Sequence, residues 1–150
     1  MAFVQFEDGR GQLEVAFFRE SYAEFATLLT RGRILLIEGA LVEDEFTAGF
    51  SLRAKHCWDF RQLCAQHSRC LSMTLDLRNV DTQQQLDRTL AEYRPGGTPL
   101  RLRLRTDNAS GALDLNGSQS VRSDPELLGR LRVLPGISEV QLHLRKPWAS

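Results

Sequence analysis

The clearest structural signal in the chain is MAFVQFEDGRGQLEVAFF, residues 1–18. Two runs rich in apolar side chains, residues 2–6 and 12–18, flank the turn residues 7–11. The turn contains Asp8-Gly9, and an Asp-Gly pair between two such runs is a strong hairpin signal. The second run alternates apolar with polar or small side chains, which is the period of a half-buried strand. The stretch therefore predicts a β-hairpin.

A helix and two more strands are expected after the hairpin. Ser21 and Glu24 have the spacing of a capping box, which predicts a helix that begins at Ser21. Gly39 interrupts an apolar run and predicts a bulge or a sharp bend in a strand. The expected elements are a helix over 21–29, strands over 33–42 and 50–58, an acidic loop over 43–49 between them, and a short helix over 59–66.

This order of elements, strand, strand, helix, strand, strand, is that of an OB-fold without its first strand. A complete OB-fold is a five-stranded barrel, with its helix between the third and fourth strands. Met1 lies at the start of what would be the second strand. We therefore expect a fragment of a longer polypeptide, with an incomplete barrel that leaves a strand edge unpaired.

The rest of the chain has a different pattern, β-α-β-β-α-β. The expected strands cover residues 70–77, 100–105, 112–116 and 139–145, with helices over 81–93 and from 124 onward. This pattern is typical of a ferredoxin-like α+β domain. In that topology the last strand lies at a sheet edge, where a partner protein can add a strand of its own.

Composition divides the chain near the same point. The chain is 42% hydrophobic and 25% charged, as in an ordinary soluble globular protein, and its net charge is zero. Residues 1–67 hold seven Lys/Arg and ten Asp/Glu, whereas residues 68–150 hold twelve and nine. We therefore place a domain boundary between His67 and Ser68. A dedicated nucleic-acid binder usually carries a basic excess, so the zero net charge counts against tight binding.

Several other classes of protein are disfavoured. No apolar run reaches the ~18–20 residues that span a bilayer, so no membrane partner is expected. Three cysteines, Cys57, Cys64 and Cys70, fit no common zinc spacing and are interpreted as reduced thiols of a cytoplasmic protein. The three histidines, His56, His67 and His143, lack the neighbours that metal binding or general-base chemistry needs.

Several blocks resemble the OB domain of the bacterial DNA polymerase III alpha subunit. They are residues 1–8 and 11–18, the loop residues 44–49, and the strand segments 36–39 and 52–55. The resemblance is looser after residue 68, where it rests on position in the chain, on Gly136-Ile137-Ser138-Glu139-Val140 and on the alternating last strand. The end of the chain, 145–150, departs from that family, in which an acidic or aromatic residue tends to close the chain.

The resemblance implies a non-catalytic C-terminal part of a replicative DNA polymerase. The OB segment (1–67) would bind single-stranded DNA weakly, and the second domain (68–150) would bind the tau subunit of the clamp loader. Nucleotide transfer would use Mg²⁺ held elsewhere in the parent polymerase, so no cofactor is expected in this part. Two other interpretations stay open: a free-standing OB module that binds RNA or tRNA, and a purely structural interaction domain.

The candidate nucleic-acid-binding residues lie in the first domain. Arg10, Arg53 and Lys55 could contact phosphates, and Phe3 or Phe6 could stack on a base. The competing interpretation is that these are solvated charges beside core aromatics. The acidic residues 43–45 count against nucleic-acid binding, because OB ligands commonly contact that loop.

Two candidate surfaces lie in the second domain. Arg101, Arg103 and Arg105 alternate with leucines, which favours the solvated face of a strand over a contact with DNA or an acidic partner. The candidate partner-binding residues are Val140, Gln141, Leu142, His143 and Leu144. The last four also resemble a sliding-clamp peptide, although Arg145 replaces the expected aromatic residue. A core-facing strand explains Val140, Leu142 and Leu144 equally well.

Overall fold

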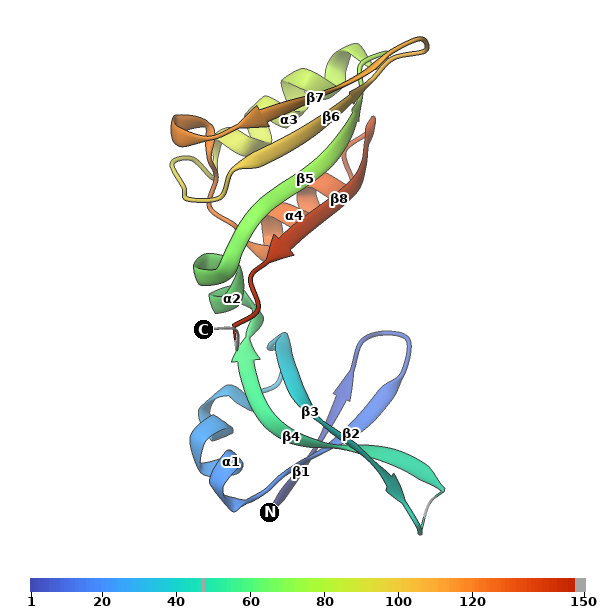
Figure 1. Ribbon diagram of the computed structural model, residues 1–150, viewed down its shortest axis with the longest axis vertical. Helices are drawn as coiled ribbons and strands as arrows, with labels where there is room; N and C mark the ends of the chain where they lie inside the picture. The colour runs from blue at the N-terminus through green and yellow to red at the C-terminus, as the bar shows by residue number, and fades with distance from the viewer. Residues whose placement is uncertain (47, 148–150) are drawn as a thin grey trace. The chain divides into compact units, whose positions relative to one another are not determined.

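The computed structural model describes residues 1–46 and 48–147, which form two compact units, Met1–Phe60 and Arg61–Ser150 (Figure 1). The units divide at Phe60, earlier than the boundary that composition places after His67. The helix α2 (Phe60–His67) explains the difference. Its Arg61 pairs with Asp124 at 3.3 Å, so the helix is joined to the second unit.

The first unit is built on a four-stranded sheet. Its strands are β1 (Ala2–Glu7), β2 (Gln12–Phe17), β3 (Leu35–Asp44) and β4 (Gly49–Asp59). Their order is β1-β2-β4-β3, in which β2 and β4 are parallel and the other pairs are antiparallel. The core lies on one side of this sheet and contains Val15, Phe17, Phe25, Ala54 and Cys57.

The predicted hairpin is confirmed, and its turn is stabilised as the sequence implies. The Asp8 carboxylate accepts hydrogen bonds from the backbone N–H groups of Arg10 and Gly11, at 2.8 and 2.9 Å. These two bonds hold the pKa of Asp8 below its ordinary value. Gly9 has φ of 81°, a conformation that residues with a Cβ atom rarely adopt.

The helix after the hairpin begins earlier than predicted. Helix α1 spans Arg19–Phe25 and continues as a short 3₁₀ turn, Ala26–Leu28. Its first turn is closed by the Tyr22 N–H, which donates to the Phe18 carbonyl at 2.7 Å. The capping box at Ser21 and Glu24 is therefore wrong, because both residues already lie inside the helix.

The bulge predicted at Gly39 is confirmed. The pairing of β3 with β4 shifts between Glu38 and Gly39, and Lys55 becomes an extra residue in β4 without a partner in β3. A Cβ atom on Gly39 would lie 2.2 Å from the Arg53 carbonyl oxygen. That oxygen belongs to the backbone of the neighbouring strand, so it cannot move aside as a side chain would.

We therefore expect Gly39→Ala to destabilise the first unit by at least about 2 kcal/mol, because an added methyl group must displace the β4 backbone. Gly111→Ala is the matched control, since Gly111 also lies in a strand and no atom lies within 4 Å of its added Cβ. Urea unfolding measures both variants. An equal free energy of unfolding for the two variants would contradict a destabilising contact between an added methyl group at Gly39 and the β4 backbone.

The second unit is also built on four strands. They are β5 (Ser68–Asp76), β6 (Leu100–Arg105), β7 (Ser110–Leu115) and β8 (Ile137–Leu144), in the order β7-β6-β5-β8. Helices α3 (Val80–Ala91) and α4 (Pro125–Arg132) lie on one face of this sheet (Figure 1). The core between them includes Leu71, Leu90, Leu100, Leu127 and Leu131, each no more than 1% exposed.

The predicted order of elements, β-α-β-β-α-β, is confirmed, but the ferredoxin-like arrangement is wrong. In that split pattern another strand lies between the two strands that the first helix joins. Here β5 and β6 are direct neighbours and pair in parallel, from Leu71↔Leu100 to Asp76↔Arg105. Element order alone does not distinguish the two arrangements. The expectation that the last strand lies at a sheet edge is confirmed for β8.

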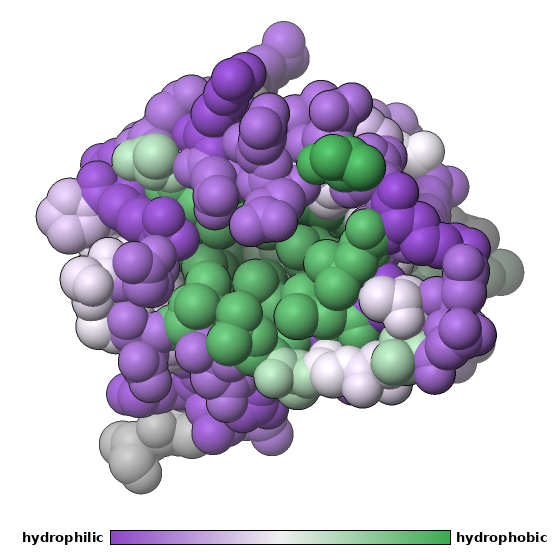
Figure 2. Space-filling view, turned by 90° about the horizontal axis from the view of Figure 1, so that it is seen from above, coloured by the Kyte–Doolittle hydropathy of each residue, from purple (hydrophilic) through white to green (hydrophobic). Residues whose placement is uncertain are grey.

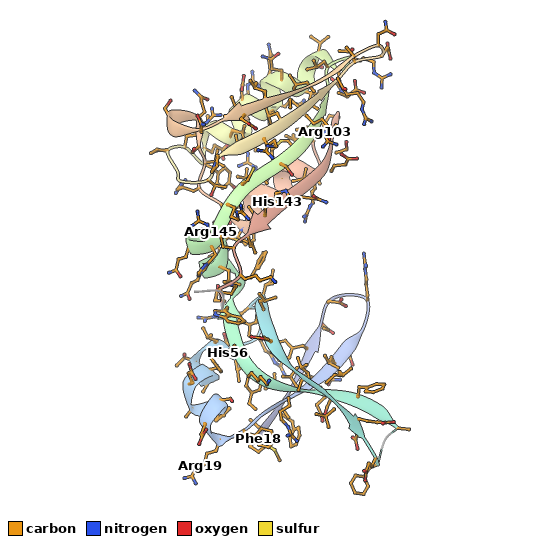
Figure 3. The ribbon with its side chains drawn as sticks, viewed as in Figure 1. Phe18, Arg19, His56, Arg103, His143 and Arg145 are labelled. Carbon is orange, nitrogen blue, oxygen red and sulfur yellow. The ribbon has the colours of Figure 1, made fainter. Side chains whose placement is uncertain are left out.

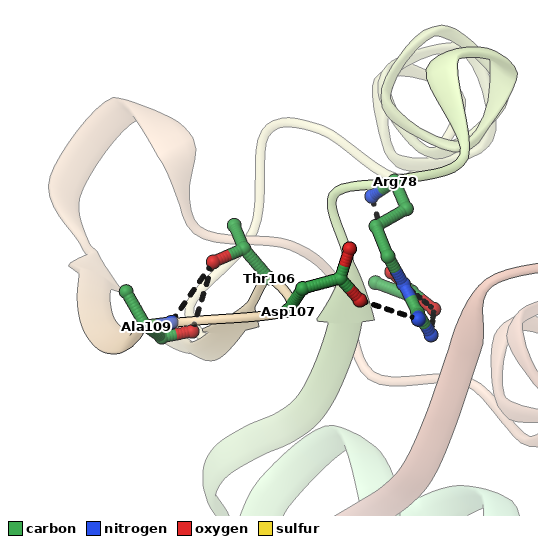
Figure 4. A network of polar contacts seen from close by, with 5 residues as sticks. Arg78, Thr106, Asp107 and Ala109 are labelled. Carbon is green, nitrogen blue, oxygen red and sulfur yellow. Dashed lines mark hydrogen bonds and ion pairs between the residues drawn. The ribbon is translucent and has the colours of Figure 1, made fainter.

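An arginine joins two loops at one end of this sheet (Figure 4). Arg78, in the loop before α3, pairs with Asp76 at 2.7 Å and with Asp107 at 2.8 Å. Asp107 lies in the turn between β6 and β7, where Thr106 and Ala109 also hydrogen-bond to each other. Hydrogen bonds from Arg78 lower the pKa of Asp76 from 3.8 to about 2.

This pKa shift predicts a pH-dependent stability. Because Asp76 titrates lower in the folded chain than in the unfolded chain, its contribution is complete above pH 3.8 and is lost as the pH falls toward about 2. We expect Arg78→Ala to unfold at lower urea concentration at pH 6, with the difference from the original chain shrinking at pH 2. A difference that stays constant over that range would exclude the Asp76–Arg78 pair as its source.

Candidate nucleic-acid interface and partner-binding strand

Two of the predicted nucleic-acid-binding residues lie on one face of the first sheet. Phe3 of β1 pairs with Ala16 of β2, which pairs in turn with Arg53 of β4, so Phe3 and Arg53 share a face. Phe3 is 58% exposed. The Arg53 guanidinium lies 4.7 Å from the centre of the Phe18 ring, a cation–π contact. An exposed ring and a positioned cation in one row are what a single strand of nucleic acid requires.

The other three predicted residues are placed differently. The Phe6 ring packs against the core, which fits the competing interpretation better than base stacking. Arg10 is exposed in the hairpin turn, and it lines a shallow hollow together with Phe6 and Leu35. Lys55 is the exposed bulge residue of β4.

Sequence reasoning missed two exposed phenylalanines, Phe46 in the β3–β4 loop and Phe50 near the start of β4. The Phe46 side chain is 98% exposed and Phe50 is 59% exposed. The Asp44 carboxylate accepts a hydrogen bond from the Phe46 N–H at 2.9 Å and so shapes the backbone there. The sequence carries a signal for this exposure. Phe46 directly follows the acidic residues 43–45, and charged neighbours favour a solvent-exposed loop. The same loop position is a usual contact of OB-fold ligands.

A second aromatic pair lies farther along β4. The rings of His56 and Trp58 stack with their centres 5.6 Å apart. They occupy the same strand as Arg53, and Figure 3 shows His56 and Phe18 in this unit. Of the two phenylalanines predicted to stack, only Phe3 is exposed, and Phe18, Phe46 and Phe50 are further exposed aromatic side chains of this unit.

One of the three arginines of the β6 stripe forms an ion pair within the sheet. Arg101 pairs with Asp114 of β7 at 3.0 Å. Arg105 lies opposite Asp76 of β5, and Arg103 lies opposite Thr74. Carboxylates thus lie next to Arg101 and opposite Arg105 but not opposite Arg103, and the interpretation of the stripe as the solvated face of a strand stays a prediction.

Strand β8 presents its backbone edge and two polar side chains. Val140 is buried and Leu142 packs against the core, whereas Gln141 and His143 are exposed. The His143 ring is hydrogen-bonded to the Ser72 hydroxyl at 2.9 Å, and Figure 3 shows its place on the sheet. Leu142 is thus unavailable to a sliding-clamp pocket while this unit is folded. The strand edge remains the accessible feature.

Among the described residues of both units, few groups are suited to nucleophilic chemistry or to metal binding. Cys57 and Cys64 are buried, and burial raises the pKa of both thiols, that of Cys64 to about 11. A thiol with that pKa is protonated at neutral pH and is a poor nucleophile. Among residues 1–46 and 48–147, no cluster of three His, Cys, Asp or Glu side chains could hold a metal ion. Nor do the described helices include one long and apolar enough to cross a membrane.

Residues 1–59 match the family of OB-fold nucleic acid binding domains. The first unit thus contains an OB-fold nucleic-acid-binding domain, as its order of elements predicts. The chain is also 47% identical, over 97% of its length, to DNA polymerase III subunit alpha of Xylella fastidiosa strain 9a5c. It is 29% identical to the proteins of the same name from Escherichia coli K12, over 91% of the chain, and from Pseudomonas aeruginosa, over 97%.

The chain is therefore homologous to the DNA polymerase III alpha subunits along nearly its whole length, which confirms the resemblance seen in the sequence. It spans only 13% of the Xylella protein and 12% of the other two.

Proposed function

We propose that the chain is the non-catalytic C-terminal part of a replicative DNA polymerase alpha subunit. In this proposal the first unit holds single-stranded DNA weakly, and the second unit tethers the polymerase to the tau subunit of the clamp loader. The observation that carries it is the homology to the alpha subunits over 97% of the chain. Nucleotide addition, with its Mg²⁺, would belong to other parts of the parent protein.

The proposed DNA-binding surface relies on stacking more than on charge. Phe3 and Phe46 offer exposed rings, and Arg53 supplies a cation on the same face of the sheet as Phe3. Residues 1–67 carry three more acidic than basic residues, ten against seven, so attraction to phosphates is small. Weak binding with little sequence preference is the behaviour that these features support.

The open edges of the first sheet belong to the same proposal. Among the described residues, β1 and β3 each pair with one strand only. A fifth strand between them would close the sheet into an OB barrel and remove both edges. We propose that the longer parent protein supplies this strand.

The proposed tether uses the edge of β8. A strand of the tau subunit would pair with this edge, and its side chains would lie next to Gln141 and His143 on the exposed face of the sheet. Such a tether raises the local concentration of polymerase near the clamp loader, so a modest affinity is sufficient.

For the DNA surface, we expect Phe46→Ala and Arg53→Ala each to weaken binding of a fluorescent oligothymidylate by at least about fivefold, as loss of one stacking contact would. Fluorescence anisotropy of the full chain measures the affinity. Tyr22→Ala is the control, because Tyr22 is an aromatic residue of α1 that is 45% exposed. An equal loss in all three variants would contradict a specific surface at Phe46 and Arg53.

For the tether, we expect the double variant Gln141→Glu, His143→Glu to weaken binding of the purified tau subunit by at least about tenfold. Charged side chains on an edge strand oppose the pairing of another strand, and this variant adds two glutamates to β8. The control places two glutamates at Ser110 and Ala112, which are exposed on the opposite edge strand, β7.

Isothermal titration calorimetry measures both tau affinities. No binding by the folded original chain would refute the tether. In that case, tight binding of RNA at about 0.15 M salt would favour a free-standing RNA-binding module instead.

A further inference from the structure

An apolar groove of about 390 Å³ lies between α3 and the β6–β7 half of the second sheet. Four leucines line its sheet side: Leu102, Leu104, Leu113 and Leu115. Val80 and Leu86 line its helix side. Figure 2 shows apolar side chains gathered in a hollow on the surface of the molecule, surrounded by polar residues.

The groove exists because the helix layer stops before the edge of the sheet. Leu113 of β7 pairs with Leu102 of β6, so both side chains point to the face that carries the helices. Leu102 is only 5% exposed, whereas Leu113 is 45% exposed. The helices therefore cover this face at β6 and leave it open at β7.

Two apolar side chains of the groove lining, Val80 and Leu77, do not contribute to the core. Val80, the first residue of α3, is 85% exposed. Leu77, at the end of β5, is 45% exposed. Water contact with apolar side chains on opposite walls of one groove is unfavourable, and such a patch is typical of a protein interaction site.

The charged side chains that line the groove are all acidic. Its lining includes the carboxylates of Asp76 and Asp87 and the amides of Asn79 and Gln83, and no Lys or Arg. Asp76 is already paired with Arg78. Asp87 is exposed and forms no ion pair with the described residues, so its charge is available to a basic group on a partner.

We propose that this groove binds an amphipathic helix of a partner protein, with an apolar stripe on one face and Lys or Arg along one flank. A helix fits because α3 and α4 already form a helix layer on this face, and a helix ~10–12 Å wide extends that layer over β7. The stripe would place apolar residues at i, i+3, i+4 and i+7 against the leucines. The groove lies at the β7 side, opposite β8, and is therefore distinct from the proposed tau site.

Two synthetic peptides test the groove. Both form helices with leucines at i, i+3, i+4 and i+7, and they differ only in lysine or glutamate along one flank. Fluorescence anisotropy with the full chain should show the lysine peptide binding at least about tenfold more tightly than the glutamate peptide. Asp87→Lys should remove or reverse this preference.

Matched variants locate the site. Val80→Gln and Leu113→Gln should each weaken binding of the lysine peptide by at least about fivefold. Val133→Gln should leave it unchanged, because Val133 is a valine of the same unit, similarly exposed at 79%, outside the groove lining. Circular dichroism confirms that each variant is folded.

Three results would overturn the proposal. One is failure of the folded chain to bind the lysine peptide. Another is a loss with Val133→Gln equal to that with Val80→Gln, which would mean nonspecific apolar adhesion. The third is self-association of the chain in sedimentation velocity that Val80→Gln abolishes, because the groove would then hold a second copy rather than a partner helix.

Discussion

A four-stranded sheet must cover its apolar face and its two outer strands, and each unit of this molecule does so only in part. Among the described residues, β1 and β3 are the outer strands of the first sheet, and β7 and β8 are those of the second. Unpaired strand edges and uncovered apolar faces attract other chains. The proposed strand closure, the tau tether and the helix groove all lie where the coverage of a sheet stops. This common cause makes a binding role the simplest account of the fold.

Charge has a structural role in this chain more than a nucleic-acid-binding one. Arg101, Arg130 and Arg78 each pair with a carboxylate in the second unit, and these pairs join neighbouring strands, helices or loops. The second segment, residues 68–150, keeps a basic excess of three, and the acidic excess of residues 1–67 brings the net charge of the chain to zero. In the proposed function, affinity for single-stranded DNA comes mainly from exposed rings such as Phe46, whose contribution depends little on salt.

Local signals in the sequence predicted local structure well. Asp8-Gly9 predicted the hairpin and Gly39 the bulge, because each depends on a few neighbouring backbone groups. The capping-box spacing of Ser21 and Glu24 placed the start of α1 too late. The neighbours of β5 were not predictable in the same way. Two strand orders share one order of elements, and packing between distant residues selects between them. Phe46 was missed as a site residue because only the acidic residues 43–45 of its loop were considered, and they count against nucleic-acid binding.

The most direct test of a chain with two separate binding surfaces is hydrogen–deuterium exchange of the full chain with each partner in turn. The account predicts that oligothymidylate slows exchange in the β1–β2 hairpin and the β3–β4 loop, and leaves β8 unchanged. The purified tau subunit should slow exchange in β8 and leave the hairpin unchanged. Protection of the same segments by both partners, or of neither region at saturating concentration, would contradict the account.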